Sequence, residues 1–135
     1  MDPQQLDLSK YRQEKAQDEL ETARIMFTSK KFSQSINRSY YAMFHAVRAL
    51  LALDKFDSKK HTGIISYFNL HYIKSGKIEP EFSTILSAAF KIRNISDYND
   101  FYVASGEDAQ LQLSNAAIFL NRIKECIETE KKRST

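Results

Sequence analysis

Apolar residues recur at helical spacing along almost the whole of this 135-residue chain, and only three glycines and two prolines interrupt them. An all-β sandwich or barrel needs a turn about every 8–12 residues, and this sequence lacks the residues that make such turns. A hydrophobic fraction of 42%, with 12% aromatic residues, is typical of a folded globule. The sequence therefore predicts a single all-α domain.

Five helical segments are expected from the periodicity and from local start and stop signals. They cover about residues 8–29, 33–54, 57–73, 80–96 and 105–127. Asp57 or Ser58 is the expected cap of the third segment, Gly76 its stop, and Pro80 fits the first turn of the fourth. Ser105 and Asp108 match a capping box before the last segment.

The long segments predict a four-helix up-and-down type bundle with an additional short helix. The expected organisation is a flexible N-terminus over residues 1–7, one helical domain over residues 8–130, and a polar basic tail over residues 131–135.

Charge and composition say little about partners. The 20 Lys and Arg residues are interleaved with 17 Asp and Glu residues, which gives a net charge of only +3. No apolar run approaches the 18 or so residues of a membrane span, and the N-terminus does not resemble a signal peptide. The single Cys126 cannot form an internal disulfide. We expect a cytoplasmic protein without membrane contact.

Several familiar chemical sites are absent from the sequence. It has no Gly-rich phosphate loop and no Glu-x-x-His pair, and its one cysteine and three histidines are scattered. The sequence therefore predicts neither a metal site nor a cofactor.

One position breaks the pattern of the fourth segment, because Arg93 continues an inward-facing stripe that includes Phe82 and Leu86. Burying an unpaired charge is very costly, so this guanidinium needs a partner. It either forms an ion pair with Asp97 near a helix end or lies in a crevice or interface where it meets a phosphate. Spacing alone leaves both interpretations open.

Three stretches resemble the HEPN-domain family. Residues 36–46, INRSYYAMFHA, resemble the "RxYYAxFHA" helix of that family, and residues 60–68, KHTGIISYF, resemble the segment that follows it. Residues 93–98, RNISDY, are similar to the family's "RxxxDY" variant. The resemblance covers about Tyr11 to Ile127.

The resemblance implies a small dimeric helical bundle that acts beside nucleotides or RNA, often with a separately encoded minimal nucleotidyltransferase in a toxin–antitoxin pair. In active ribonucleases of the family, an Arg steadies the scissile phosphate and a nearby His deprotonates the ribose hydroxyl, without metal. Arg93 and Asn94 match that Arg and the polar residue after it, whereas Tyr98 stands at the His position. A tyrosine hydroxyl is a far weaker base than imidazole at neutral pH.

Three functions follow as hypotheses. The first is a dimeric module with weak or no catalysis in a toxin–antitoxin or defence-type pair. It binds a nucleotide, RNA or a nucleotidyltransferase partner, and its expected phosphate or nucleotide contacts are Arg93, Asn94, Tyr41 and His61. The second is an active metal-independent ribonuclease toxin whose catalytic residues are Arg93, Asp97 and Tyr98, where Tyr98 or a distant His61 or His45 supplies acid and base. The third is a structural helical adaptor. The histidines and the Tyr40–Tyr41 pair also suit simple packing roles.

Overall fold

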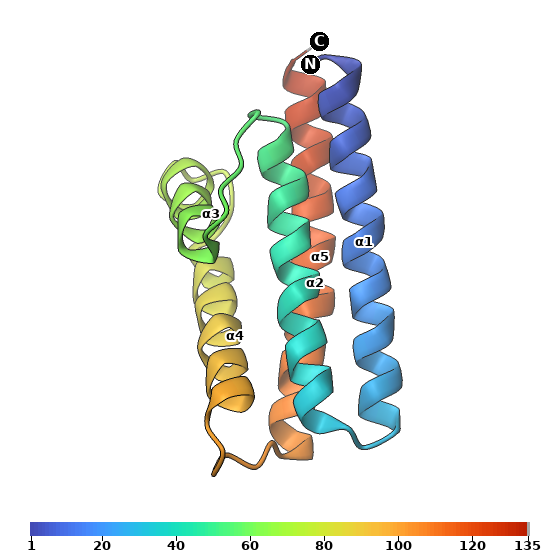
Figure 1. Cartoon of the computed structure of the whole chain (residues 1–135). Coiled ribbons are helices and arrows are strands. Elements are labelled where there is room, and N and C mark those ends of the chain that lie inside the picture. The colour runs from blue at the N-terminus through green and yellow to red at the C-terminus, as the bar shows by residue number, and fades with distance from the viewer. Residues whose placement is uncertain (135) are drawn as a thin grey trace.

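The structure, a computed structural model, describes residues 1–134, which contain helices and no strand. Its elements are α1 (Pro3–Thr28), α2 (Phe32–Ala52), α3 (His61–Phe68), a π-helical turn η1 (Asn69–Ile73), α4 (Pro80–Tyr98) and α5 (Gly106–Arg133). Successive long helices run in opposite directions, and α3 lies beyond one end of α4 (Figure 1). The predicted all-α bundle with an additional short helix is confirmed.

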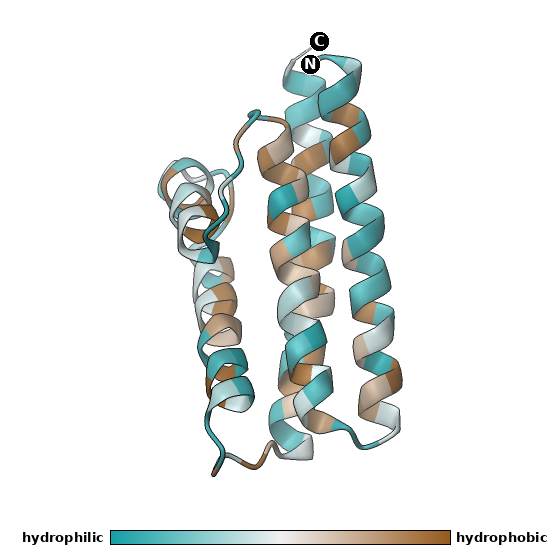
Figure 2. Ribbon diagram, in the orientation of Figure 1, coloured by the Kyte–Doolittle hydropathy of each residue, from teal (hydrophilic) through white to brown (hydrophobic). Residues whose placement is uncertain are grey.

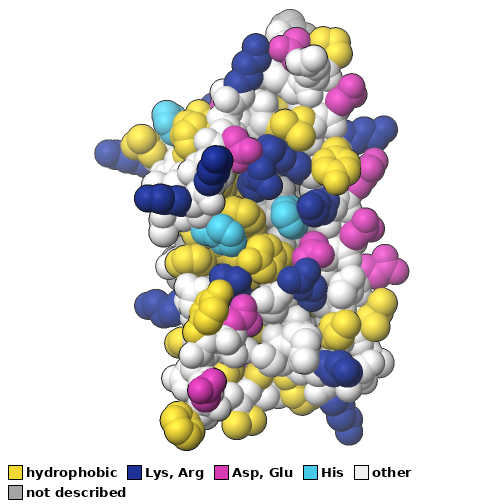
Figure 3. Space-filling view, viewed as in Figure 1, with side chains coloured by type: hydrophobic (Ala, Val, Ile, Leu, Met, Phe, Trp, Pro, Cys, Tyr) yellow, Lys and Arg dark blue, Asp and Glu magenta, His cyan; other side chains and the backbone are white. Residues whose placement is uncertain are grey.

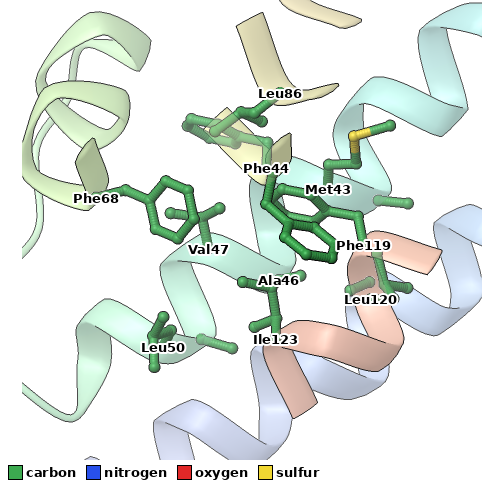
Figure 4. Packing of buried hydrophobic residues seen from close by; sticks show 14 of the residues in the cluster. Met43, Phe44, Ala46, Val47, Leu50, Phe68, Leu86, Phe119, Leu120 and Ile123 are labelled. Carbon is green, nitrogen blue, oxygen red and sulfur yellow. The ribbon is translucent and has the colours of Figure 1, made fainter. Parts of the chain in front are cut away.

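Helix α2 lies at the centre of the core and packs against α1, α4 and α5. Its Phe44, Val47 and Leu50 meet Phe68 of α3 and Phe119 of α5 in a continuous buried cluster (Figure 4). Full burial of one such side chain contributes ~1.5–3 kcal/mol to stability, so this cluster supplies most of the driving force that holds the helices together.

Helix α1 is more hydrophilic than α2, as Figure 2 shows. It buries mainly small or medium side chains, Ala16, Leu20 and Ala23, and this allows a close approach to α2. None of the helices within residues 1–134 combines the length and the apolar character that crossing a membrane requires.

Helix α1 begins at Pro3 rather than at the predicted residue 8, so the expected flexible N-terminus is helical from its third residue. Asp2 caps the helix by accepting from the backbone N–H of Gln5 at 2.9 Å, and the Gln5 side chain accepts from the Asp2 N–H at 2.8 Å. This is a capping box with a proline at the first helical position, which is a strong local start signal. Gln5 also donates to the Leu53 carbonyl at 2.7 Å, which fixes the helix start to the end of α2.

Helix α5 likewise extends through the predicted basic tail as far as Arg133. Residue 135, the last of that tail, lies outside the described residues. The Ser105 hydroxyl accepts from the Asp108 N–H at 3.0 Å, as predicted. The Asp108 carboxylate accepts from the Tyr102 hydroxyl at 3.0 Å instead of completing the capping box.

The third segment begins later than predicted, at His61, and Lys60 precedes it without a side-chain cap. Asp57 does not cap the helix, because its carboxylate pairs with Arg12 and Arg48. The segment ends in η1, and the Tyr72 hydroxyl donates to Asp54 at 2.7 Å, which ties the turn to the end of α2. The predicted stop, Gly76, has a φ of 83°, a conformation that glycine adopts without strain.

Candidate functional site

Helix α2 leaves one stripe partly open to solvent. From residue 35 to residue 52, every side chain of α2 is buried except Asn37, Arg38, Tyr41, His45 and Arg48. The last four recur at steps of three and four, so they lie along one face of the helix. We call these five residues the open stripe. The face that contains it carries His and hydrophobic side chains at its middle, with Lys and Arg above and below (Figure 3).

Arg93 reaches the open stripe from α4. Its Nη2 donates to the Tyr41 hydroxyl at 2.8 Å, and its Nη1 donates to Asn94 Oδ1 at 3.1 Å. The guanidinium carbon lies 5.1 Å from the centre of the Tyr41 ring and 5.6 Å from that of Tyr40, distances at which a cation is attracted to an aromatic face. Only 13% of the Arg93 side chain is exposed, so its position is set by these contacts.

The expected ion pair between Arg93 and Asp97 is present, with Nε and the carboxylate 2.9 Å apart. The carboxylate lies off the direction of the N–H bond, so the buried Nε makes no hydrogen bond. Asp97 is itself held by Asn37, whose Nδ2 donates to it at 2.9 Å. The two described hydrogen bonds of Arg93 also leave one N–H on each terminal nitrogen without a described acceptor. The guanidinium is therefore fixed in place with donors to spare.

His61, the first residue of α3, contacts the same two tyrosines as Arg93, with its ring centre 5.8 Å from those of Tyr40 and Tyr41. Its ring stacks on Phe44 with centres 4.1 Å apart, and its Nδ1 lies 2.7 Å from the Tyr40 hydroxyl oxygen. Burial lowers the pKa of His61, and the positive charges of Arg93 and Arg48 lower it further. Because the ordinary pKa of histidine is about 6.5, His61 is neutral at pH 7.

The contact with Tyr40 also determines which nitrogen of His61 carries the proton. Tyr40 is fully buried, and His61 Nδ1 is the only acceptor described for its hydroxyl. A buried hydroxyl without an acceptor is costly, so Tyr40 donates and Nδ1 accepts. We infer from this network that the proton is on Nε2. His61 therefore offers a hydrogen-bond donor at Nε2 and not a lone pair.

Tyr98 is placed differently from the other predicted residues. Its ring centre lies 5.8 Å from the Arg93 guanidinium, but 75% of the residue is exposed and no hydrogen bond is described for its hydroxyl. The structure thus brings Arg93, Asn94, Tyr41 and His61 into one cluster. Asp97 pairs with Arg93, and Tyr98 lies at the edge.

Sequence reasoning did not single out Arg38 as a site residue. Its guanidinium carbon lies 5.1 Å from the centre of the Tyr41 ring, so Tyr41 is flanked by Arg38 and Arg93. Arg38 also pairs with Glu19 of α1 at 2.7 Å. The three-residue step from Arg38 to Tyr41 was the available signal, because residues at that spacing meet on a helix surface.

The site holds no arrangement that suggests a metal centre. Within residues 1–134, no three His, Cys, Asp or Glu side chains come close enough together to hold an ion.

The chain is similar to several known proteins. The HEPN domain family matches residues 9–126. A candidate toxin of Methanocaldococcus jannaschii is 32% identical over 113 residues, which is 84% of this chain and 84% of that protein. A second candidate toxin of the same organism is 32% identical over 111 residues, 82% of this chain and 76% of that protein. A UPF0332 protein of Gloeobacter violaceus is 36% identical over 121 residues, 89% of this chain and 93% of that protein.

A solved structure agrees with these sequence matches. An archaeal HEPN homologue superimposes with a TM-score of 0.69 and 20% identity, covering 88% of this chain and 97% of that one. At this identity the likeness supports the fold alone, whereas the family match spans most of the sequence. The chain therefore belongs to the HEPN domain family.

Proposed function

We propose that this protein is the toxin-side HEPN module of a toxin–antitoxin pair and that it binds the phosphate groups of RNA or a nucleotide, with weak or no catalysis. The observation that carries this proposal is the state of Arg93, a fixed guanidinium with unused N–H donors beside the neutral His61. The candidate toxins among the relatives favour the toxin side.

The cluster offers the groups that phosphate recognition uses. A guanidinium presents its donors in a planar fork that matches two phosphate oxygens. The Nε2–H of His61 supplies a further donor, and Asn94 holds one arm of the fork in place. The exposed ring of Tyr98 is available to stack on a base.

The same geometry argues against efficient cleavage. To act as a base, His61 would have to carry its proton on Nδ1, which would leave the buried Tyr40 hydroxyl without an acceptor. Leaving a buried donor unsatisfied costs about 1–3 kcal/mol. Tyr98, at the position of the family's histidine, is a poor substitute as a base.

Protein partners are part of the proposal. The end of α4 and the loop after it expose Tyr98, Phe101 and Val103 at 75%, 96% and 87%. Exposed apolar side chains gathered in one segment mark interaction surfaces. This exposed segment supports the proposal of a homodimer and of contact with a minimal nucleotidyltransferase. We propose a cytoplasmic location for the complex.

The proposal is tested by measuring binding of AMP by calorimetry and of a labelled single-stranded oligoribonucleotide by fluorescence anisotropy. Arg93→Gln should weaken binding of both at least tenfold. The control Arg24→Gln changes an exposed arginine on α1 and should leave binding unchanged. A wild-type protein that binds neither ligand would overturn the proposal. If Arg93→Gln lowers only the melting temperature, the structural adaptor is the better description.

The second candidate is a metal-independent ribonuclease toxin. The observation that favours it is that His61 and Arg93 both contact Tyr40, which brings an imidazole to the cluster although the sequence lacks one near residue 98. RNA cleavage in EDTA decides between the two. Cleavage by the wild type that is lost in both Arg93→Gln and His61→Gln would establish the ribonuclease.

A further inference from the structure

A second group of cations lies about two helical turns along α2 from Tyr41. A hollow of about 550 Å³ lies there, and it is lined by Arg48, Lys59, Ser58, Asp57, His61 and Phe44. We propose that this hollow is a second phosphate subsite, so that the ligand of this protein carries successive phosphates and spans both positions. This inference rests on the proposed function, because it extends the ligand bound at Arg93.

The hollow carries a surplus of positive charge. Arg12 donates to the Asp57 carboxylate at 3.1 Å, and Arg48 donates to it at 2.8 Å and 3.3 Å. Two guanidinium groups thus share one carboxylate. Lys59 is exposed and has no ion-pair partner among the described residues. The two cations that line the hollow, Arg48 and Lys59, exceed its one carboxylate by one charge, and Arg12 adds a further positive charge behind Asp57.

Arg12 and Arg48 have different roles at Asp57, and only Arg48 lines the hollow. Arg12 is buried, with 8% of its area exposed, and also donates to the Arg48 carbonyl at 3.1 Å, so it cannot turn outward. It therefore holds the Asp57 carboxylate from within. The Arg48 side chain is 25% exposed, and both N–H groups of its Nη1 lack a described acceptor. Arg48 is the guanidinium that a phosphate in the hollow would meet.

His61 links the hollow to the Arg93 cluster. His61 lines the hollow and also contacts Tyr40, on which the Arg93 guanidinium lies. Along the open stripe, Tyr41, to which Arg93 is bonded, and Arg48 are seven residues apart, which is about 10 Å on a helix. One phosphate cannot contact both ends of such a stripe, whereas a chain of phosphates can.

His45 lies between the two positions on the open stripe and has an unsatisfied buried atom. Its Nδ1 is inaccessible to solvent and has no hydrogen-bond partner. Burial, together with the positive charges of Lys15, Arg48, Arg38 and Arg12, lowers the pKa of His45 to about 4. Asp57 and Glu19 pair with three of these four cations, so an excess of positive charge remains around the ring for an anionic ligand to neutralise.

The test compares ligands that carry one phosphate with ligands that carry several. Binding of AMP and ATP is measured by calorimetry, and binding of labelled oligoribonucleotides of two, four and eight nucleotides by fluorescence anisotropy at several salt concentrations. Lys59→Gln and Arg48→Gln should weaken binding of the longer oligoribonucleotides about three- to tenfold and reduce the salt slope by about one. AMP binding should not change. Arg93→Gln should weaken binding of every ligand.

Lys59→Gln is the decisive variant, because Arg48 also helps to hold Asp57 whereas Lys59 pairs with nothing described. Lys124→Gln on α5 is the matched control, since it makes the same charge change in a different groove. If ATP binds more tightly than AMP, and Lys59→Gln and Arg48→Gln remove this gain, the ligand is a nucleoside polyphosphate. An effect confined to oligoribonucleotides identifies an RNA strand.

The two proposals fail in different ways. Should the wild type bind AMP and oligoribonucleotides while Lys59→Gln and Arg48→Gln behave like Lys124→Gln, the second subsite is overturned and the proposed function stands. A wild type that binds no ligand overturns both.

Discussion

Arg93 and Tyr41, 52 residues apart in the sequence, are joined by a 2.8 Å hydrogen bond from Nη2 to the tyrosine hydroxyl. The bond links the last turns of α4 to the middle of α2. It also gives both residues a role that their sequence positions did not indicate. The sequence placed Arg93 on an apolar stripe and suited Tyr41 to the core, whereas in the structure both belong to one polar cluster.

Removing the hydroxyl of Tyr41 should loosen Arg93 without removing the charge of Arg93. In Tyr41→Phe the guanidinium keeps its place over the ring but loses one acceptor, so we expect a loss of about 1 kcal/mol in unfolding free energy. Ligand affinity should fall severalfold, less than in Arg93→Gln. Urea denaturation and the anisotropy assay measure the two effects. Tyr11→Phe, at an exposed position on α1, is the control. Unchanged affinity in Tyr41→Phe would show that Tyr41 does not position Arg93 for binding.

The protonation of His61 is directly observable. Long-range proton–nitrogen NMR spectra should show the proton of neutral His61 on Nε2, because the Tyr40 hydroxyl donates to Nδ1. Tyr40→Phe removes that donor and should allow both tautomers, with a loss of about 1 kcal/mol in stability. A proton on Nδ1 in the wild type would contradict the assignment and would favour the ribonuclease.

Stability should fall on mild acidification. The pKa of His45 is about 4 in the folded protein, against about 6.5 in the unfolded chain, so the unfolded state binds the extra proton first as pH decreases. The free energy of unfolding therefore decreases between pH 6.5 and pH 4, by at most about 3 kcal/mol. His61, whose pKa is also lowered, acts in the same direction.

Urea denaturation at a series of pH values between 7 and 4.5 measures this loss. His45→Gln should flatten the dependence, since glutamine takes up no proton in this range. His71→Gln changes an exposed histidine and should leave the slope as it is in the wild type. An equal slope in all three proteins would show that His45 does not cause the effect.

Gly63 is required by the close approach of the loop before α3. A Cβ added there would lie 2.5 Å from the Ser58 Oγ and 3.0 Å from the Ser58 Cβ. Gly63→Ala should cost about 1–2 kcal/mol in stability, because such overlap forces the loop to move. Adding Ser58→Gly removes both atoms and should recover most of that loss. A double-mutant cycle by thermal unfolding measures the coupling, and additive costs would show that the contact is not responsible.

The helical class and most of the helix order could be predicted, because both depend on periodicity and on local signals. The start of α1 was missed although its signal was present, since Asp2, Pro3 and Gln5 together form a start motif. The predicted cap of the third segment was wrong for a different reason. Asp57 is a good local cap, but Arg12 lies 45 residues away and pairs with it in the fold. An ion pair between segments that are distant in the sequence overrides a local capping preference, and the residues around the cap do not reveal it.

The candidate site divides along the same line. The sequence by itself determined the helices, the family and the unusual position of Arg93, because side-chain spacing and residue type are local properties. Only the tertiary structure decided that Arg93 meets Tyr41, that His61 joins them through Tyr40, and that Arg12 holds Asp57 beside Arg48. Each of these contacts depends on how α1, α3 and α4 pack against α2. That packing is set by the summed burial of many side chains, so the partners of a single polar group follow from the whole core and not from its sequence neighbours.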